Sequence, residues 1–325
     1  MRFHYPVLFG LLSAAAVYAQ HGSLASPSMG FAFDAASGSI RPIRGVPGAA
    51  LLGEGIDAGS PLASAAISPR QDYALAIGSA GERLRLIPLA AQVSGTALPE
   101  ETMAAPERMI FSPSGSAALL VQADRVQILA GLPGHVTATS LDLSPISPVP
   151  TALAVADDGA LAAVADAGAA WIVASDGGSL QLALPGSTVA LAFRRNSRDL
   201  LAISAAGDVY LVHNPGPDSG YRMLYSGDEQ TADPVAAQFS WGGDRAYTVN
   251  SRGNIVVIDM EGGAWSAISC GCRTTALDPL NARNLFRLTA PGRSPVRLFD
   301  GSGSEARVWF VPPGNSGRAS EGSIQ

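Results

Sequence analysis

The feature that most constrains the fold is a strand–turn–strand–turn–strand pattern that recurs along the chain. Its clearest copy spans residues 237–264, where a short apolar run leads to a Ser-Trp-Gly-Gly turn. Two further runs follow, separated by a turn at residues 250–254. β-Branched and aromatic residues fill the runs, whereas Gly, Asn and Asp occupy the turns. This arrangement is typical of a β-meander.

The copies are spaced at a nearly constant interval. Each copy has an apolar residue directly before its first turn, and we use this residue as an anchor. Successive anchors are 44, 44, 38, 46 and 38 residues apart. The anchors are Ile67, Phe111, Val155, Phe193, Phe239 and Leu277.

Repeats of roughly 40–45 residues with about four short strands each are typical of propeller blades. One blade cannot bury both of its faces, so radial stacking of blades completes the core. A β-sandwich with coincidental spacing is the alternative, but six evenly spaced copies favour the propeller. We therefore predict an all-β propeller made of four-stranded antiparallel blades.

The number of blades depends on the segment before the first full copy. We interpret residues 31–34 as the third strand of a partial blade and residues 39–43 as its fourth strand. Residues 45–60 are rich in Gly and Ala and are interpreted as a long connection. Six copies and this partial blade predict a seven-bladed ring closed by contact between its two ends. Six blades with an N-terminal patch is the alternative.

The copies resemble the YVTN-type, WD40-like propeller repeats of bacterial secreted proteins. The turn at 112–115, Ser-Pro-Ser-Gly, resembles the turn that follows the innermost strand in that family. Ile258-Asp259 and Phe299-Asp300 resemble the end of its third strand, and residues 247–250 are a rearranged form of its tetrapeptide. The resemblance extends from about residue 31 to residue 313. It implies a secreted propeller and no particular activity, because the family is functionally mixed.

The N-terminus predicts export. Arg2 and His4 precede an apolar stretch at residues 7–17, and Val17-Tyr18-Ala19 offers small residues for cleavage. The apolar stretch is shorter than the roughly 20 residues of a spanning helix, and we expect no membrane span. We predict a signal peptide at 1–19, cleaved after Ala19, and a secreted or periplasmic protein.

The remaining chain divides into two parts. We predict a propeller domain at 20–313 and a disordered tail at 314–325, because the tail carries little apolar surface with which to offset the entropy of ordering. We expect a monomer.

Composition limits the chemistry and the partners. Every basic residue is Arg, since no Lys occurs. The chain therefore has no Lys for Schiff-base formation or for a phosphate-binding P-loop. Loss of Arg2 with the signal peptide leaves 20 basic and 27 acidic residues, a net charge of −7. Without a clustered basic face, this balance argues against nucleic acid as a partner.

Candidate ligand-binding residues are few. Arg108 and Arg273 lie just before predicted first strands, so they could face the channel mouth and bind an anion. The densest basic segment, Arg-Arg-Asn-Ser-Arg at 194–198, falls in a predicted turn, where a solvated turn is favoured over an anion site.

Cys270 and Cys272 are the two cysteines of the chain. In an exported protein this pair favours a disulfide, with two free buried thiols or part of a metal site as alternatives. Two thiolates fall short of the four ligands of a usual zinc site, so we expect no metal and no cofactor.

No catalytic residue stands out. His135 and His213 fall in predicted loops or strand ends, and no nucleophile elbow or metalloprotease helix occurs. The carboxylates that we can place at turns and strand ends, where solvent is expected to keep them ordinary acids, are Asp72, Asp124, Asp208 and Asp244.

The sequence therefore favours an exported, non-catalytic propeller that binds an unknown protein or small ligand through loops at one face of the ring. The alternatives are a propeller hydrolase of the sugar-lactonase type and a structural module of an envelope assembly. Three or more converging His, Glu, Asp or Arg side chains at the channel mouth would favour the enzyme. An apolar mouth or one lined by Ser and Thr would favour binding.

Overall fold

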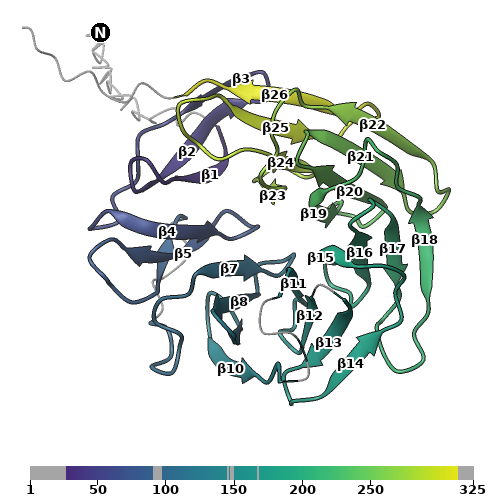
Figure 1. Ribbon diagram of the computed structural model, residues 1–325. Helices are drawn as coiled ribbons and strands as arrows, with labels where there is room; N and C mark the ends of the chain where they lie inside the picture. The colour runs from purple at the N-terminus through teal and green to yellow at the C-terminus, as the bar shows by residue number, and fades with distance from the viewer. Residues whose placement is uncertain (1–26, 91–96, 145, 147–149, 167, 314–325) are drawn as a thin grey trace, which may run out of the picture.

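The computed structural model describes residues 27–90, 97–144, 146, 150–166 and 168–313. The secondary structure of this part of the chain consists of 26 β-strands, which form seven antiparallel sheets. The sheets stand around a central axis as the blades of a propeller (Figure 1). The prediction of an all-β, seven-bladed propeller is confirmed, and the six-bladed alternative is wrong. The predicted signal peptide and tail lie outside the described residues.

We number the blades 1 to 7 in chain order, and every blade is one contiguous segment. The first strands are β1 (Ser28–Asp34), β4 (Leu62–Ile67), β7 (Arg108–Phe111), β11 (Ala152–Val155), β15 (Thr188–Phe193), β19 (Pro234–Phe239) and β23 (Asp278–Pro279). The second strands are β2 (Ser39–Val46), β5 (Tyr73–Gly78), β8 (Ala117–Gln122), β12 (Leu161–Ala165), β16 (Leu200–Ser204), β20 (Arg245–Asn250) and β24 (Leu285–Arg287).

The third strands are β3 (Ala49–Leu52), β6 (Arg85–Pro88), β9 (Arg125–Ala130), β13 (Ala170–Ala174), β17 (Val209–Val212), β21 (Asn254–Asp259) and β25 (Val296–Asp300). The fourth strands are β10 (Thr137–Leu141), β14 (Ser179–Leu182), β18 (Tyr221–Tyr225), β22 (Trp265–Ser269) and β26 (Arg307–Val311). The prediction of four strands per blade holds for blades 3–7. Within the described residues, blades 1 and 2 have three strands each.

One turn is repeated in six blades. The backbone N–H of the residue after the first strand donates to the carbonyl oxygen five residues later, over 2.8–2.9 Å. The donors are Ser68, Ser112, Ala156, Arg194, Ser240 and Leu280. Five of the six predicted anchors are thus the last residues of first strands. The sixth is wrong by two residues, because Pro279 and not Leu277 precedes this turn.

Blade 1 differs from the other blades because β1 runs antiparallel to β4, the first strand of blade 2. The turn after β1 lies at the start of β4, where Leu62 N donates to Gly38 O over 2.8 Å. The beginning of β1 lies at the end of β4, where Phe31 N donates to the Gln71 side chain over 2.6 Å. By direction and order, β1, β2 and β3 match the second, third and fourth strands of a regular blade.

This finding corrects two sequence predictions. Residues 31–34 lie in β1, which matches the second strand of a regular blade and not the third. Residues 39–43 lie in β2, which matches the third strand and not the fourth. The segment 45–60 is not merely a connection, because it contains the end of β2 and all of β3. Its Gly and Ala content concealed the short strand, since both residue types have low β propensity.

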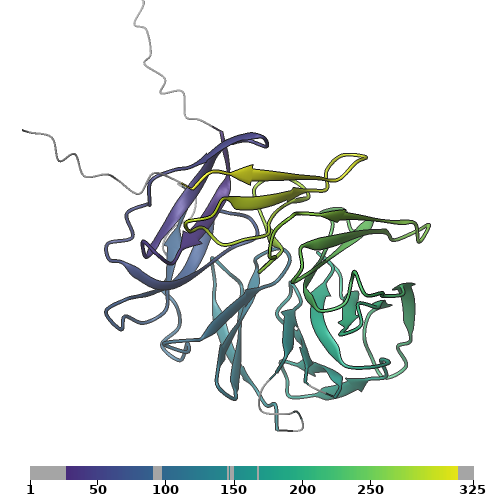
Figure 2. The same ribbon diagram turned by 45° about the horizontal axis from the view of Figure 1, so that its top comes forward.

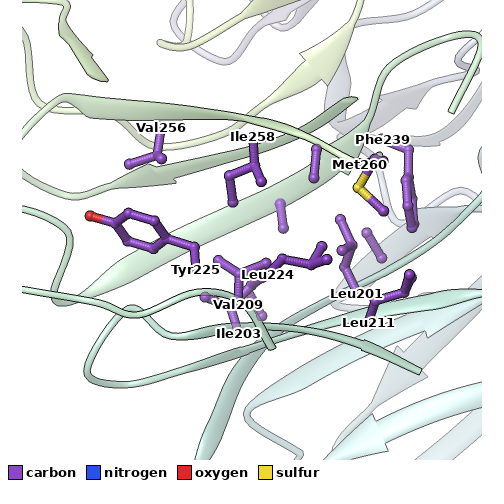
Figure 3. Close-up of a cluster of buried hydrophobic side chains, with 14 residues drawn as sticks. Leu201, Ile203, Val209, Leu211, Leu224, Tyr225, Phe239, Val256, Ile258 and Met260 are labelled. Carbon is purple, nitrogen blue, oxygen red and sulfur yellow. The ribbon is translucent and has the colours of Figure 1, made fainter. Parts of the chain in front are cut away.

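The hydrophobic core consists of seven clusters, one at each seam between neighbouring blades. Figure 3 shows the cluster between blades 5 and 6, where Leu201, Ile203 and Leu211 face Val256 and Ile258. The last seam joins blade 7 to blade 1, so the first and last blades of the described chain lie side by side (Figure 2). None of the described residues forms a helix that could cross a membrane.

Candidate functional site

The inner-turn rim is the end of the ring at which the repeated turns meet. We define it as residues 29–31 of blade 1 and the turns at 68–72, 112–116, 156–160, 194–199, 240–244 and 280–284. Each seam is crossed at this rim by a specific contact, and at six seams this contact is a hydrogen bond. These bonds are Phe31 N to Gln71 Oε1 (2.6 Å), Tyr73 Oη to Gly115 O (2.5 Å), Ser114 N to Asp157 Oδ1 (2.7 Å), Asn196 N to Asp157 Oδ2 (2.7 Å), Trp241 N to Asn284 Oδ1 (2.6 Å) and Asn281 N to Met29 O (2.8 Å).

The seventh contact joins blades 5 and 6 and is a cation–π interaction. The Arg195 guanidinium carbon lies 3.8 Å from the centroid of the Trp241 ring. Trp241 is 44% exposed, and Arg195 is half-buried. Gly243 makes room at the same seam: it has φ +73°, and a Cβ there would lie 2.1 Å from Arg194 Nε. The rim is therefore a closely packed set of turns that presents a tryptophan and an arginine to solvent.

Two small cavities share part of their lining, and both of these side chains line the first of them. The rim cavity measures about 40 Å³ and is lined by Arg195, Trp241 and Asn284 together with apolar residues. The channel cavity measures about 60 Å³ and is lined mainly by aliphatic and aromatic side chains of first strands. Both cavities are lined by Pro69, Pro113, Phe193, Gln238 and Pro279.

Arg195 is the one ionisable side chain in the lining of either cavity. Its positive charge is partly removed from water, and burial lowers the pKa of Arg195; the nearby Asp157 carboxylate opposes this shift and Arg70 adds to it. The criterion set from the sequence asks for three or more converging His, Glu, Asp or Arg side chains, and among the described residues Arg195 alone of these types lines either cavity.

The carboxylates near the rim are engaged in structure. Asp157 uses both oxygens to accept backbone N–H groups of the two neighbouring turns. Asp72 accepts from Ser68 Oγ over 2.7 Å and pairs with Arg70 Nε over 3.0 Å. Asp244 accepts from Ser240 Oγ over 2.6 Å, and this hydrogen bond lowers the pKa of Asp244. A lowered pKa is the opposite of what a general base near neutral pH requires.

Arg108 and Arg273, the arginines singled out from the sequence, lie elsewhere. Arg108 begins β7 and is exposed, and Arg273 is exposed in the segment that enters blade 7. Both precede first strands, so they lie toward the opposite end of the ring from the inner-turn rim. The structure does not bring them together at either cavity.

Of the basic segment 194–198, two arginines have acidic partners. Arg194 Nη1 lies 3.5 Å from Asp199 Oδ2, and Arg198 Nη2 lies 2.8 Å from Asp158 Oδ2. Arg195 differs because it packs on Trp241. For Arg195, which is half-buried against Trp241, the choice between a solvated residue and an anion site stays a prediction.

The cysteines lie in the connection between blades 6 and 7, away from the rim. The Sγ atoms of Cys270 and Cys272 are bonded at 1.95 Å, and Cys270 is buried against blade 7. His135 and His213 are both exposed, and His213 Nδ1 lies 3.5 Å from Asp199 Oδ1. Among the described residues, no group of three or more His, Cys, Asp or Glu could hold a metal ion.

The sequence contains a signal for the rim that emerges once the ends of the first strands are aligned. The residue two positions after the last residue of each first strand falls on the rim in every blade from 2 to 7. These residues are Pro69, Pro113, Asp157, Arg195, Trp241 and Asn281. A propeller brings equivalent positions of all blades to one mouth, so this column of residues predicts the mouth's chemistry.

Comparison with known proteins supports the fold. No family model matches the chain, and no curated protein matches its sequence. A functionally unknown protein from Desulfotomaculum acetoxidans matches with a TM-score of 0.56 at 13% identity, over 87% of this chain and 99% of that one. Apo AztD from Citrobacter koseri matches with a TM-score of 0.53 at 15% identity, over 86% and 93%. Hsv2 from Kluyveromyces lactis matches with a TM-score of 0.52 at 10% identity, over 88% and 98%. At such identities the similarity shows a shared propeller fold and no shared activity.

Proposed function

We propose that this protein is an exported, non-catalytic propeller that binds a ligand or partner at the inner-turn rim. The observation that carries the proposal is the pair formed by the exposed Trp241 and the half-buried Arg195 at the entrance of an apolar cavity. Trp and Arg are enriched among the residues that contribute most to binding. Ligand sites are commonly apolar hollows with a few fixed polar groups.

The rigidity of the rim supports this proposal. Contacts from blade to blade fix the turns before a ligand arrives, so binding costs little ordering entropy. Asp157 and Asn284 hold backbone atoms of neighbouring turns, which keeps Arg195 and Trp241 in register. The rim is thus a preorganised surface.

Two parts of the proposal rest on the sequence. The repeats resemble the YVTN-type family of secreted propellers, and the Val17-Tyr18-Ala19 site suits signal-peptide cleavage. We infer a secreted or periplasmic monomer that begins at Gln20. Mass spectrometry of protein from the native host checks the cleavage, and an intact Met1 on the mature protein would contradict it.

A screen of small-molecule fragments by ligand-observed NMR tests the binding function. We expect hits for the wild-type protein that are lost in Trp241→Ala and retained in Trp265→Ala. Trp265 is a matched control because it is 55% exposed on β22, away from the rim. Hits that persist in both variants would place binding elsewhere, and the absence of any hit would contradict a small-ligand function.

The lactonase alternative is tested on the same protein. We expect no turnover of sugar lactones or esters above background, with or without added calcium. Turnover that a chelator abolishes would replace the binding proposal with an enzyme.

A further inference from the structure

Arg195 is a charged group whose hydrogen-bond donors have no partner. Within the described residues its guanidinium makes no hydrogen bond and no ion pair, and its one specific contact is the face of the Trp241 ring. The neighbours on its own turn differ, since Arg194 and Arg198 each lie beside an aspartate. A guanidinium carries five N–H donors in a planar fork that matches a carboxylate.

No carboxylate forms an ion pair with Arg195 among the described residues. The charge of the nearby Asp157 favours the charged form of Arg195, but the oxygens of Asp157 accept backbone N–H groups over 2.7 Å. Arg70 lies close enough to disfavour the charge on Arg195 and is itself paired with Asp72. The N–H donors of the Arg195 guanidinium therefore stay available for a carboxylate from a ligand.

Gln238 is a second unpartnered polar group. Its side chain lines both the rim cavity and the channel cavity, and its amide makes no hydrogen bond within the described part of the chain. The rest of the shared lining is proline and phenylalanine. An amide in such surroundings favours a ligand that supplies an acceptor or a donor.

We propose that the rim site binds a monocarboxylate with a short apolar chain, the carboxylate on Arg195 and Gln238 and the chain in the cavities. This proposal rests on the proposed binding function and specifies its ligand. Cavities of about 40 and 60 Å³ can hold a few water-sized groups each, so they suit a short aliphatic chain and not a long one. Such a carboxylate occurs in a free organic acid and at the end of a polypeptide with a C-terminal aliphatic residue.

Isothermal titration calorimetry with a matched set of ligands tests the proposal. We expect hexanoate to bind more tightly than acetate, because acetate leaves the cavities unfilled, and more tightly than decanoate, because its chain exceeds them. Hexanamide, which has the same chain without the charge, should bind at least tenfold more weakly than hexanoate. N-Acetyl-leucine and a peptide ending in leucine distinguish the free acid from the chain end, according to which binds more tightly.

Variants locate the site. Arg195→Gln should weaken hexanoate binding at least tenfold, and Arg198→Gln should leave it unchanged because Arg198 is exposed and paired with Asp158. Melting curves establish that both variants are folded. If Arg195→Gln fails to fold, the comparison of hexanoate with hexanamide on the wild-type protein still decides the question.

The outcomes separate this inference from the function it rests on. Equal affinity for hexanoate and hexanamide, or hexanoate binding that survives Arg195→Gln, would overturn the carboxylate assignment. Neutral fragments that bind in a Trp241-dependent way while all carboxylates fail would also overturn it and leave the binding function intact. Failure of carboxylates and fragments alike would reject both.

Discussion

Neighbouring blades pack differently at two seams, the one between blades 5 and 6 and the one between blades 7 and 1. At the first, two regular blades meet through fourteen buried residues, and the chain itself runs from one blade into the next. At the second, blade 7 meets blade 1 through ten buried residues, and within the described residues no peptide segment connects them. Among its described residues, blade 1 also lacks a strand that matches the first strand of a regular blade.

The closing seam has contacts that compensate for these differences. Gln71 of blade 2 accepts from Phe31 N of blade 1 and donates to Pro279 O of blade 7 over 2.7 Å. One side chain therefore joins blades 1, 2 and 7 at the inner-turn rim. Within the described residues, closure of this ring therefore depends on noncovalent contacts alone, whereas the chain itself links the blades at every other seam.

Truncation of one buried leucine at each seam gives the largest expected effect. Leu298 at the closing seam and Leu201 at the seam of blades 5 and 6 are both 0% exposed. Leu298→Ala and Leu201→Ala should each lower the free energy of unfolding by about 2–5 kcal/mol, measured by chemical denaturation. Hydrogen exchange should differ, because Leu298→Ala should speed exchange in β1–β3 selectively. Exchange in blade 1 that rises no more than in blade 4 would contradict a distinct closing seam.

The sequence predicted regular blades well, because their turns have strong local signals. Phe111 and Phe239 are each followed by a Ser-containing turn whose backbone hydrogen bond recurs, so the predicted ends of β7 and β19 were correct. Blade 1 was misread by one strand position. An apolar strand that ends in Asp34 and is followed by a Gly-containing turn fits the second strand as well as the third, and strand direction is not encoded locally.

The candidate site was only partly predictable. Arg195 and Trp241 lie 46 positions apart in the sequence, and each falls in a turn where a solvated side chain is the usual expectation. Their contact depends on neighbouring blades presenting equivalent positions to one mouth. Gln238 carried no signal, because nothing in an alternating strand shows which face borders a cavity.

Removal of the Asp34 charge tests how blade 1 is held together without a strand that matches the first strand of a regular blade. Asp34 Oδ2 lies 3.1 Å from Arg41 Nη1, and Arg41 Nε donates to Gly53 O at the end of β3 over 2.8 Å. Their side chains are 7% and 13% exposed. Hydrogen bonds to charged groups contribute about 1.5–3 kcal/mol, so Asp34→Asn should lower the melting temperature clearly at pH 7.

The pH dependence of this variant follows from the pKa of Asp34. Burial acts to raise that pKa, but hydrogen bonds from Arg41, Ser37 and Ala36 outweigh it, and the folded-state pKa lies below the ordinary 3.8. The unfolded chain then binds more protons, so the contribution is complete above about pH 5 and is lost as pH falls through the folded pKa. The difference in melting temperature between wild type and Asp34→Asn should shrink between pH 5 and pH 3. If the difference in melting temperature stays constant with pH, the loss of stability comes from the changed shape of the side chain and not from its charge.

Gln71→Leu should weaken closure by a similar or smaller amount. It leaves Phe31 N and Pro279 O without their partner, and an unsatisfied buried polar group costs about 1–3 kcal/mol. Gln127→Leu is the matched control. Gln127 is equally buried at 6% exposure and also bonds two backbone groups, Met103 N and Glu101 O, away from the closing seam. We expect faster hydrogen exchange in blade 1 for Gln71→Leu alone, and equal exchange in both variants would argue against a closing role for Gln71.

The smallest effect is expected at Cys270 and Cys272, which lie in the connection between blades 6 and 7. A disulfide with one residue between its cysteines closes a very short loop, so its entropic stabilisation should be about 2 kcal/mol or less. A Cys270→Ser, Cys272→Ser double variant should therefore melt closer to wild type than Leu298→Ala does. Thiol labelling of unfolded protein should reveal two reactive groups only after reduction, and full labelling without reduction would rule out the disulfide. Because the bond lies within one chain connection, its loss should leave hydrogen exchange in blade 1 unchanged, whereas faster exchange there would mean that the connection helps to hold the ring closed.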